Sequence, residues 1–189
     1  MHLVTLAGSP GSHSRSTRML THVTQRARAV GAHCRAFGLA DFDPAVLVEG
    51  RWDNPAVAAL RAAVADADAL VVATPVYQAC FSGGLKLLLD LLPQNALAHT
   101  TSLTLASGGS DRHLLILDYA LKPVLASLGA RRQLAGVYAN AAQLSREDDG
   151  EYHLGVDLQT RLNEAFDELR ESVMAQHRPR HPARPAVMA

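Results

Sequence analysis

A loop near the start of the chain is rich in glycine, serine and proline and carries residue types that bind phosphate. Residues 8–17 read Gly-Ser-Pro-Gly-Ser-His-Ser-Arg-Ser-Thr. Serine hydroxyls and backbone N–H groups can donate hydrogen bonds to phosphate oxygens, and Arg15 adds a positive charge. An ordinary polar turn with a serine N-cap is the alternative interpretation.

The elements on either side of this loop would aim its donors at one point. The apolar run 2–7 predicts a buried strand, and a helix is predicted from about residue 15 to residue 30. A helix N-terminus that follows a tight loop directs free N–H groups and a positive dipole end at an anion. The patterns G-x-x-x-x-G-K-[ST] and G-x-G-x-x-G are absent, which argues against a nucleotide triphosphate loop and a dinucleotide loop. A serine-rich loop without lysine fits a phosphate that is held and not transferred, such as that of FMN.

Two further loops follow predicted strands and could contact a flat ligand. After the third predicted strand, Tyr77 and Pro75 could form a flat wall for a ring. After the fourth, Gly108 and Gly109 would let backbone N–H groups approach a polar ring edge. Because the carboxyl ends of parallel strands lie at one edge of a sheet, the three loops together fit one flat phosphorylated ligand. Tyr77 could instead be a core aromatic that caps its strand.

Strands and helices alternate along the chain, which indicates α/β layering around a parallel sheet. We predict one domain over residues 1–177, with a five-stranded parallel sheet and helices on both faces. A Pro/Arg-rich tail, 178–189, is predicted to be disordered, and the segment 41–55 is predicted to be rich in loops. The predicted strands span 2–7, 32–37, 69–73, 102–106 and 134–139, and the predicted helices span about 15–30, 55–66, 82–92, 113–128 and 157–177.

Composition limits the classes of function. The 189 residues are 48% hydrophobic, and 18 basic residues balance 18 acidic ones. A neutral chain argues against nucleic acid or an acidic membrane as the main partner, and no apolar run reaches the roughly 18 residues of a membrane span. Cys34 and Cys80 lack ligand spacing, and no signal peptide is evident. We therefore expect a cytoplasmic protein with both thiols reduced and partly buried.

Two groups of polar residues could suggest other chemistry. Ser110, Asp111 and His113 lie too close in sequence to form a hydrolase triad, and no G-x-S-x-G motif is present. His177 and His181 have no carboxylate or thiol nearby. We therefore predict no metal site and no side chain that acts as a catalytic acid or base.

The motifs, taken as a set, resemble those of the NAD(P)H-dependent FMN reductases, in particular those that serve two-component alkanesulfonate monooxygenases. The resemblance covers nearly the whole chain. It rests on residues 6–10, 14–16, 73–77, 82–83, 85–86, 88–93, 108–109, 113–115, 118–125 and 158–162.

The resemblance implies a flavodoxin-like fold with strand order 2-1-3-4-5. It also implies reduction of FMN by NADPH or NADH, and release of reduced FMN to a flavin-dependent monooxygenase in sulfonate-sulfur assimilation. Position 11 departs from the family, which often has arginine there, because this chain has Gly11. The departure either weakens the hold on the phosphate or shifts the charge to Arg15. The site residues implied by the resemblance are Ser9, Ser14, Arg15 and Ser16 for the phosphate, Pro75, Val76 and Tyr77 for the ring, and Gly108 and Gly109 for its polar edge.

The resemblance also implies a homodimer or homotetramer. Tyr119 lies off the apolar face of the predicted helix 113–128, and Pro123 removes the N–H that would bond to the Tyr119 carbonyl. These features predict a local helix distortion near a subunit interface, and in the family a tyrosine at the matching position accompanies a one-residue π-bulge. A surface tyrosine without such a role is the alternative.

Two other functions remain open at this point. One is a quinone or azo-dye reductase with tightly held FMN. The other is a non-enzymatic electron carrier of the flavodoxin type.

Overall fold

The computed structural model describes residues 1–11, 13–146 and 150–177 and has a mostly parallel sheet at its centre. The main path of the sheet runs β2-β1-β3-β5-β6, with β7 also paired to β5 and the short β4 paired antiparallel to β3. This is the predicted order 2-1-3-4-5, with β6 and β7 together in the place of the fifth strand. The predicted tail, 178–189, lies outside the described residues.

The strands are β1 His2–Ala7, β2 His33–Gly38, β3 Ala69–Tyr77, β4 Cys80–Phe81, β5 Thr101–Gly108, β6 Arg132–Gln133, β7 Val137–Asn140, β8 Leu144–Arg146 and β9 Tyr152–Leu154. The α-helices are α1 Arg15–Ala29, α2 Pro44–Glu49, α3 Pro55–Ala65, α4 Gly83–Asp90, α5 Lys122–Ser127 and α6 Val156–His177. A π-helix spans Leu117–Leu121, and short 3₁₀ turns span Leu39–Asp41, Asp111–His113 and Ala141–Gln143.

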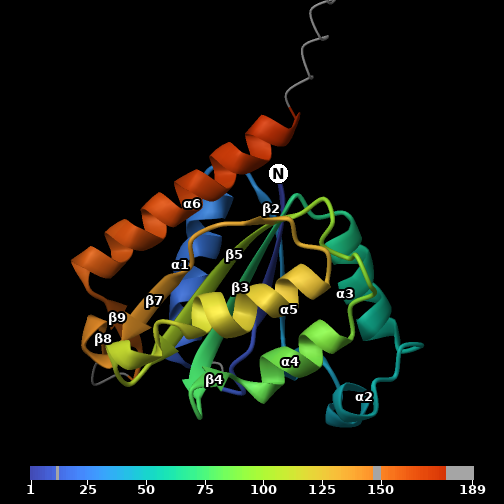
Figure 1. Cartoon of the computed structure of the whole chain (residues 1–189), viewed down its shortest axis with the longest axis horizontal. Helices are drawn as coiled ribbons and strands as arrows, with labels where there is room; N and C mark the ends of the chain where they lie inside the picture. The colour runs from blue at the N-terminus through green and yellow to red at the C-terminus, as the bar shows by residue number, and fades with distance from the viewer. Residues whose placement is uncertain (12, 147–149, 178–189) are drawn as a thin grey trace, which may run out of the picture.

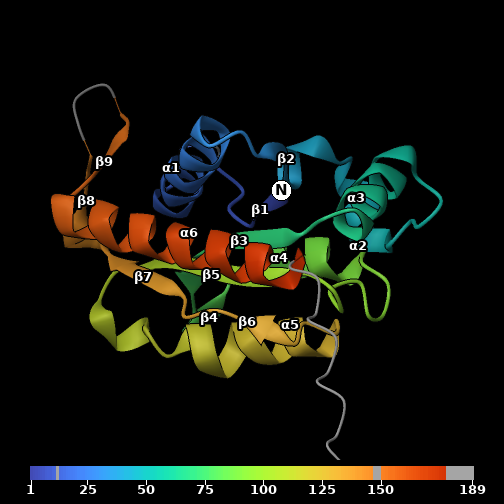
Figure 2. The ribbon, with the colours of Figure 1, turned by 90° about the horizontal axis from the view of Figure 1, so that it is seen from above.

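Helices cover both faces of the sheet (Figures 1 and 2). Side chains of α1 and α6 pack on one face, and side chains of α2, α3, α4 and α5 pack on the other. The central strand β3 shows the division directly. Val71 and Ala73 pack on the face covered by α1 and α6, whereas Leu70 and Val72 pack on the face covered by α2, α3, α4 and α5. All four side chains are fully buried. A strand covered on both faces is apolar at every position, which explains the continuous apolar run in the sequence.

Two predicted segments differ from the structure. The segment 41–55 contains a helix, α2, whose N-cap Asp43 accepts a hydrogen bond from the Ala45 N–H at 2.8 Å. The predicted fifth strand, 134–139, overlaps only β7, and β6 is a separate short strand that precedes it. Between them Gly136 lies directly against Thr104 of β5, with no room for a Cβ atom.

The predicted helix 113–128 is interrupted, and the predicted distortion at Tyr119 is confirmed. The π-helix Leu117–Leu121 ends where the Lys122 N–H donates to the carbonyl of Leu117, five residues earlier. Leu114, an apolar residue of the predicted helix, is 48% exposed. A wider turn changes the rotation between the residues before and after it, so a single 3.6-residue periodicity does not describe the whole segment.

The burial of the two cysteines and the character of the helices can be compared with what the sequence predicts. Cys34 is partly buried as predicted, whereas Cys80 is exposed because it lies in the short strand β4 beyond the core. Within the described ranges, no helix combines the length and the apolar character that crossing a membrane requires.

Candidate functional site

The three predicted loops meet at the carboxyl edge of β1, β3 and β5, which are neighbours in the sheet. The Gly8 N–H donates to the carbonyl of Ala73 at 2.8 Å, so the loop after β1 begins beside the end of β3. Pro75 pairs in register with Ser107, which places the end of β3 beside Gly108. The edge therefore has the arrangement in which open parallel sheets bind ligands.

Ser82, the N-cap of α4, ties two of these loops together. Its hydroxyl donates to the carbonyl of Gly8 at 2.5 Å and accepts the N–H of Leu85 at 3.1 Å. Its own N–H donates to Oγ1 of the buried Thr74 at 2.9 Å. Sequence reasoning did not identify Ser82 as a site residue, although a serine directly before an apolar helical run signals an N-cap.

The first turn of α1 offers free hydrogen-bond donors. Ser14 is the N-cap, and its Oγ accepts the N–H of Thr17 at 3.1 Å. The N–H groups of Arg15 and Ser16 belong to the first turn, which has no helical acceptors, and no described residue accepts them. The hydroxyls of Ser9 and Ser16 belong to buried residues of the same loop. The loop thus presents backbone and hydroxyl donors around one helix N-terminus.

Arg15 and its neighbours contact a hairpin that the sequence did not predict. The Arg15 guanidinium carbon lies 5.1 Å from the ring centroid of Tyr152 in β9, and its Nε is buried without a hydrogen-bond partner among the described residues. Arg18 Nε donates to the Tyr152 carbonyl at 2.9 Å, and His13 Nδ1 lies 2.6 Å from Glu151 Oε1. A polar cavity of about 380 Å³ opens between α1 and β9 here.

The loop after β3 forms a tight hairpin with β4. Pro75 and Val76 are half-buried, and Tyr77 is 52% exposed, so its ring is not a core side chain. Gln78 and Ala79 form the turn with positive φ values of 47° and 59°. Positive φ at both central positions matches a type I′ turn, but such turns favour asparagine and glycine, and neither is present. The sequence therefore gave no turn signal at this position.

A largely apolar cavity of about 470 Å³ separates this turn from the segment that follows β5. Tyr119 is 79% exposed and Leu115 is 58% exposed, so large apolar groups gather at its surface. Exposed apolar groups that cluster in this way are typical of interaction surfaces. The cavity is lined by Ala79, Arg112, His113, Leu115, Ile116, Tyr119 and Ala120.

Tyr138 of β7 contacts and supports the loop after β5. Gly108 is buried and lies against the Tyr138 hydroxyl, with no room for a Cβ atom, whereas Gly109 is exposed. The same hydroxyl donates to the carbonyl of Ser110 at 2.5 Å. Burial, and secondly the negative charge of Asp111, raise the pKa of the Tyr138 phenol above its usual value. Tyr138 is a supporting residue that the sequence did not identify.

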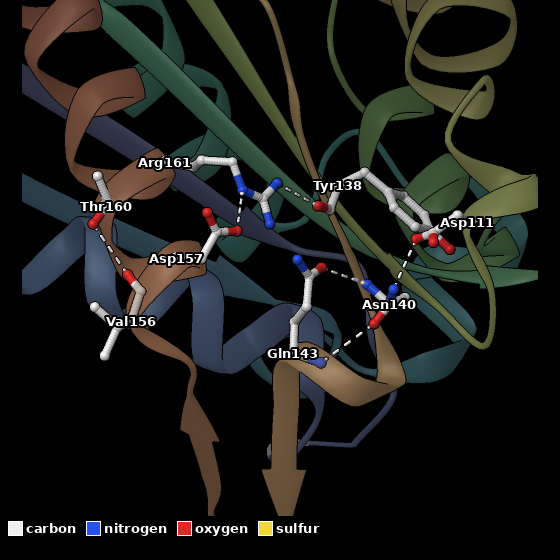
Figure 3. Close-up of polar contacts among 8 residues, drawn as sticks. All are labelled: Asp111, Tyr138, Asn140, Gln143, Val156, Asp157, Thr160 and Arg161. Atoms are coloured by element: carbon white, nitrogen blue, oxygen red, sulfur yellow. Dashed lines mark hydrogen bonds and ion pairs between the residues drawn. The ribbon is translucent and has the colours of Figure 1, made fainter.

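Further polar contacts connect this loop to β7 and α6 (Figure 3). Asn140 Nδ2 donates to Asp111 Oδ1 at 2.8 Å, and the Asn140 N–H donates to Gln143 Oε1 at 3.1 Å. Arg161 Nη1 donates to the Tyr138 carbonyl at 2.9 Å. The Asn140–Asp111 bond therefore fixes the loop to β7, and the Arg161 bond fixes β7 to α6.

Comparisons with known proteins place this arrangement in context. The model of the family described as NADPH-dependent FMN reductase matches residues 1–143. The chain is 42% identical over 171 residues to the FMN reductase (NADPH) of Escherichia coli (strain K12), which covers 88% of this chain and 87% of that protein. It is 46% identical over 82 residues to the NADH-dependent FMN reductase SfnE of Pseudomonas putida, over 43% of this chain and 44% of that one. The crystal structure of an NADH:FMN oxidoreductase (EMOB) in its apo form matches with a TM-score of 0.78 and 35% identity, over 99% of this chain and 98% of that one.

Proposed function

The chain belongs to the NADPH-dependent FMN reductase family, and we propose that it delivers reduced FMN to a partner flavin-dependent monooxygenase. It is an oxidoreductase that uses FMN and NAD(P)H on a flavodoxin-like fold. The observation that carries the site assignment is the convergence of three loops at the carboxyl edge of β1, β3 and β5. The delivery step and its place in sulfonate-sulfur assimilation are supported by the motif resemblance and by the similarity to SfnE.

The phosphate of FMN would bind at the first turn of α1. The free N–H groups of Arg15 and Ser16 suit an anion, because a helix N-terminus carries a partial positive charge. The hydroxyls of Ser9, Ser14 and Ser16 lie on the same loop, and the buried Arg15 Nε donates to none of the described residues. Exposed Gly11 adds no charge where the family often has arginine, so the positive charge falls to Arg15. The residues present therefore fit the phosphate group.

The flavin ring would lie against the loops after β3 and β5. Pro75, Val76 and the half-exposed Tyr77 supply an apolar wall. Gly108 and Gly109 supply backbone N–H groups without side chains that would block the ring edge. These donors would stabilise negative charge as it develops on the polar edge of the ring.

The chemistry of the reaction places few demands on the side chains. When bound, FMN supplies the ring that accepts a hydride from the nicotinamide. The loops hold that ring at contact distance, which is the contribution of proximity and orientation. In this proposal no side chain of the three loops acts as an acid or a base.

We infer that the assembly uses the surface around the π-helix. Tyr119 and Leu115 are exposed large side chains beside an apolar cavity, which fits an interface between copies of the chain. Such an interface would place Tyr119 close to the loop that contacts the flavin ring. A homodimer or homotetramer is therefore proposed, with Tyr119 near the interface.

One series of measurements tests the proposal. The purified full-length chain is mixed with NADPH, then with free FMN, then in a separate sample with a quinone, and NADPH oxidation is followed. We expect a colourless protein whose NADPH oxidation depends on added FMN. Protein that retains FMN and reduces the quinone would instead indicate a quinone or azo-dye reductase. Protein that retains FMN but does not oxidise NADPH would indicate an electron carrier.

A further inference from the structure

The β8–β9 hairpin lies beside the N-terminal half of α1 at one end of the sheet (Figure 2). The match to the family model ends at residue 143, one residue before β8 begins. The hairpin therefore lies outside the segment that the family model matches. The hairpin nevertheless supplies the groups that contact the charged end of the phosphate loop.

Three contacts connect the hairpin to this loop and to α1. The ring of Tyr152 lies under the Arg15 guanidinium, at 5.1 Å from the guanidinium carbon to the ring centroid. The Tyr152 carbonyl accepts the hydrogen bond from Arg18 Nε at 2.9 Å. His13 Nδ1 lies within hydrogen-bond distance of Glu151 Oε1, at 2.6 Å. Tyr152 is thus held through its backbone while its ring contacts Arg15.

The hairpin is firmly supported because both of its strands are anchored in the core. Leu144 and Leu154, which pair across the hairpin, are both buried against the α6 side of the sheet. The Gly155 N–H donates to the Gln143 carbonyl at 3.0 Å, and Gln159 Nε2 donates to the Leu154 carbonyl at 2.7 Å. Tyr152 is itself partly buried and packs against the same core cluster, so its ring is supported by the core beside the phosphate loop.

Stacking on a ring restricts an arginine without using its donors. The contact occupies one face of the planar guanidinium, whereas the N–H groups point outward along its edge. A long side chain that is already ordered loses less conformational freedom when it binds an anion. A lysine or an unsupported arginine would lack this advantage.

We propose that Tyr152 is a positioning residue of the phosphate site, whose ring holds the Arg15 guanidinium with its N–H edge toward the phosphate of FMN. This proposal rests on the assignment of Arg15 to the phosphate. It makes Tyr152 a determinant of the preference for a phosphorylated over an unphosphorylated flavin. In this proposal Tyr152 acts only through Arg15.

The test compares FMN with riboflavin, which lacks the phosphate. Steady-state KM values for both flavins are measured with NADPH for Tyr152→Leu, which removes the ring, and for Tyr152→Phe, which keeps it. We expect Tyr152→Leu to raise the KM for FMN roughly two- to fivefold, the range for a partly exposed cation–π contact, and to leave the KM for riboflavin unchanged. Tyr152→Phe should restore the wild-type KM for FMN. Tyr152→Met serves as the second variant if Tyr152→Leu does not fold.

A matched control and a double variant separate positioning from general packing. Trp52→Leu removes the ring under Arg61, a second such pair at 4.5 Å in a different part of the fold, and should change neither KM. In the Arg15→Ala background, Tyr152→Leu should have no further effect on the KM for FMN.

The possible failures are distinguishable. If Arg15→Ala weakens FMN and riboflavin equally, the phosphate assignment fails and the role of Tyr152 fails with it. If Arg15→Ala is selective for FMN but Tyr152→Leu is without effect, or weakens both flavins equally, only the role of Tyr152 is overturned. A full effect of Tyr152→Leu in the Arg15→Ala background overturns it as well.

Discussion

Gly8 at the end of β1 and Leu85 in α4 lie in direct contact, although 77 positions separate them: a Cβ atom on Gly8 would sit 2.5 Å from the Leu85 Cβ. The contact allows α4 to close over the start of the phosphate loop, where Ser82 also bonds to the Gly8 carbonyl. Glycine at position 8 is therefore required by packing, because any larger residue must displace the helix or the loop.

Gly8→Ala tests this contact. We expect the free energy of unfolding to fall by about 1–3 kcal/mol, the usual cost of adding a methyl group to a closely packed site. Chemical denaturation measures the change. Gly11→Ala is the matched control in the same loop, since a Cβ there would meet nothing within 4 Å, and its stability should stay close to that of the wild type. Equal stability of the two variants would contradict the packing argument.

Arg15→Ala tests the phosphate assignment. Loss of a charge-assisted contact should cost about 1.5–3 kcal/mol in FMN binding and raise the KM for FMN roughly ten- to a hundredfold. Riboflavin should be affected little, because it carries no phosphate. Arg26→Ala, on the same helix but paired to Asp167 at 2.7 Å, is the control and should not discriminate between the flavins. Equal weakening of both flavins by Arg15→Ala would refute the assignment.

Tyr77→Ala tests the wall of the ring site. We expect a higher KM for both FMN and riboflavin with a nearly unchanged thermal midpoint, because the side chain is 52% exposed and contributes little to the core. Trp52→Ala removes an aromatic side chain of the same exposed fraction at a different place and should leave both KM values unchanged. A large fall in the midpoint of Tyr77→Ala together with intact flavin affinity would show a structural role instead.

Tyr119→Ala tests the surface around the π-helix. With the most exposed aromatic ring of that surface removed, we expect either a change in oligomeric state or a protein that purifies yellow with flavin retained and transfer lost. Size-exclusion chromatography and the absorbance spectrum report the two outcomes. Val156→Ala, at an apolar side chain that is 81% exposed on α6, is the control. A colourless Tyr119→Ala protein with unchanged assembly and unchanged delivery of reduced FMN would contradict the proposal.

Tyr138→Phe tests the support under the loop after β5 through its pH dependence. Below the unfolded-state pKa of tyrosine, about 10, the phenol is protonated in both states and its bond to Ser110 contributes fully, by about 1 kcal/mol. Above that pH the folded state binds more protons, because its pKa is raised, so the stability of the wild type falls as pH rises. The stability difference between wild type and Tyr138→Phe should therefore shrink above pH of about 10. Urea denaturation across this range measures it, and a difference independent of pH would contradict the account.

The sequence alone determined the layered fold and the location of the candidate site. Continuous apolar strands that alternate with amphipathic helices predicted the parallel sheet and the edge where the loops meet, because burial on both faces leaves apolar runs in the local sequence. The motif resemblance added the strand order. The distortion at Tyr119 was also predictable, since Pro123 acts on a carbonyl only four residues away. These features depend on residues that are neighbours in the chain.

Only the tertiary structure decided how the loops are held. Ser82 bonds to Gly8, Tyr138 bonds to Ser110 and Tyr152 stacks on Arg15, and each partner lies far away in sequence or in another element. The turn at Gln78 adopts positive φ without glycine or asparagine, because pairing of the flanking strands imposes it. Such contacts leave no periodic signal, since they arise from where the packed core brings distant segments together.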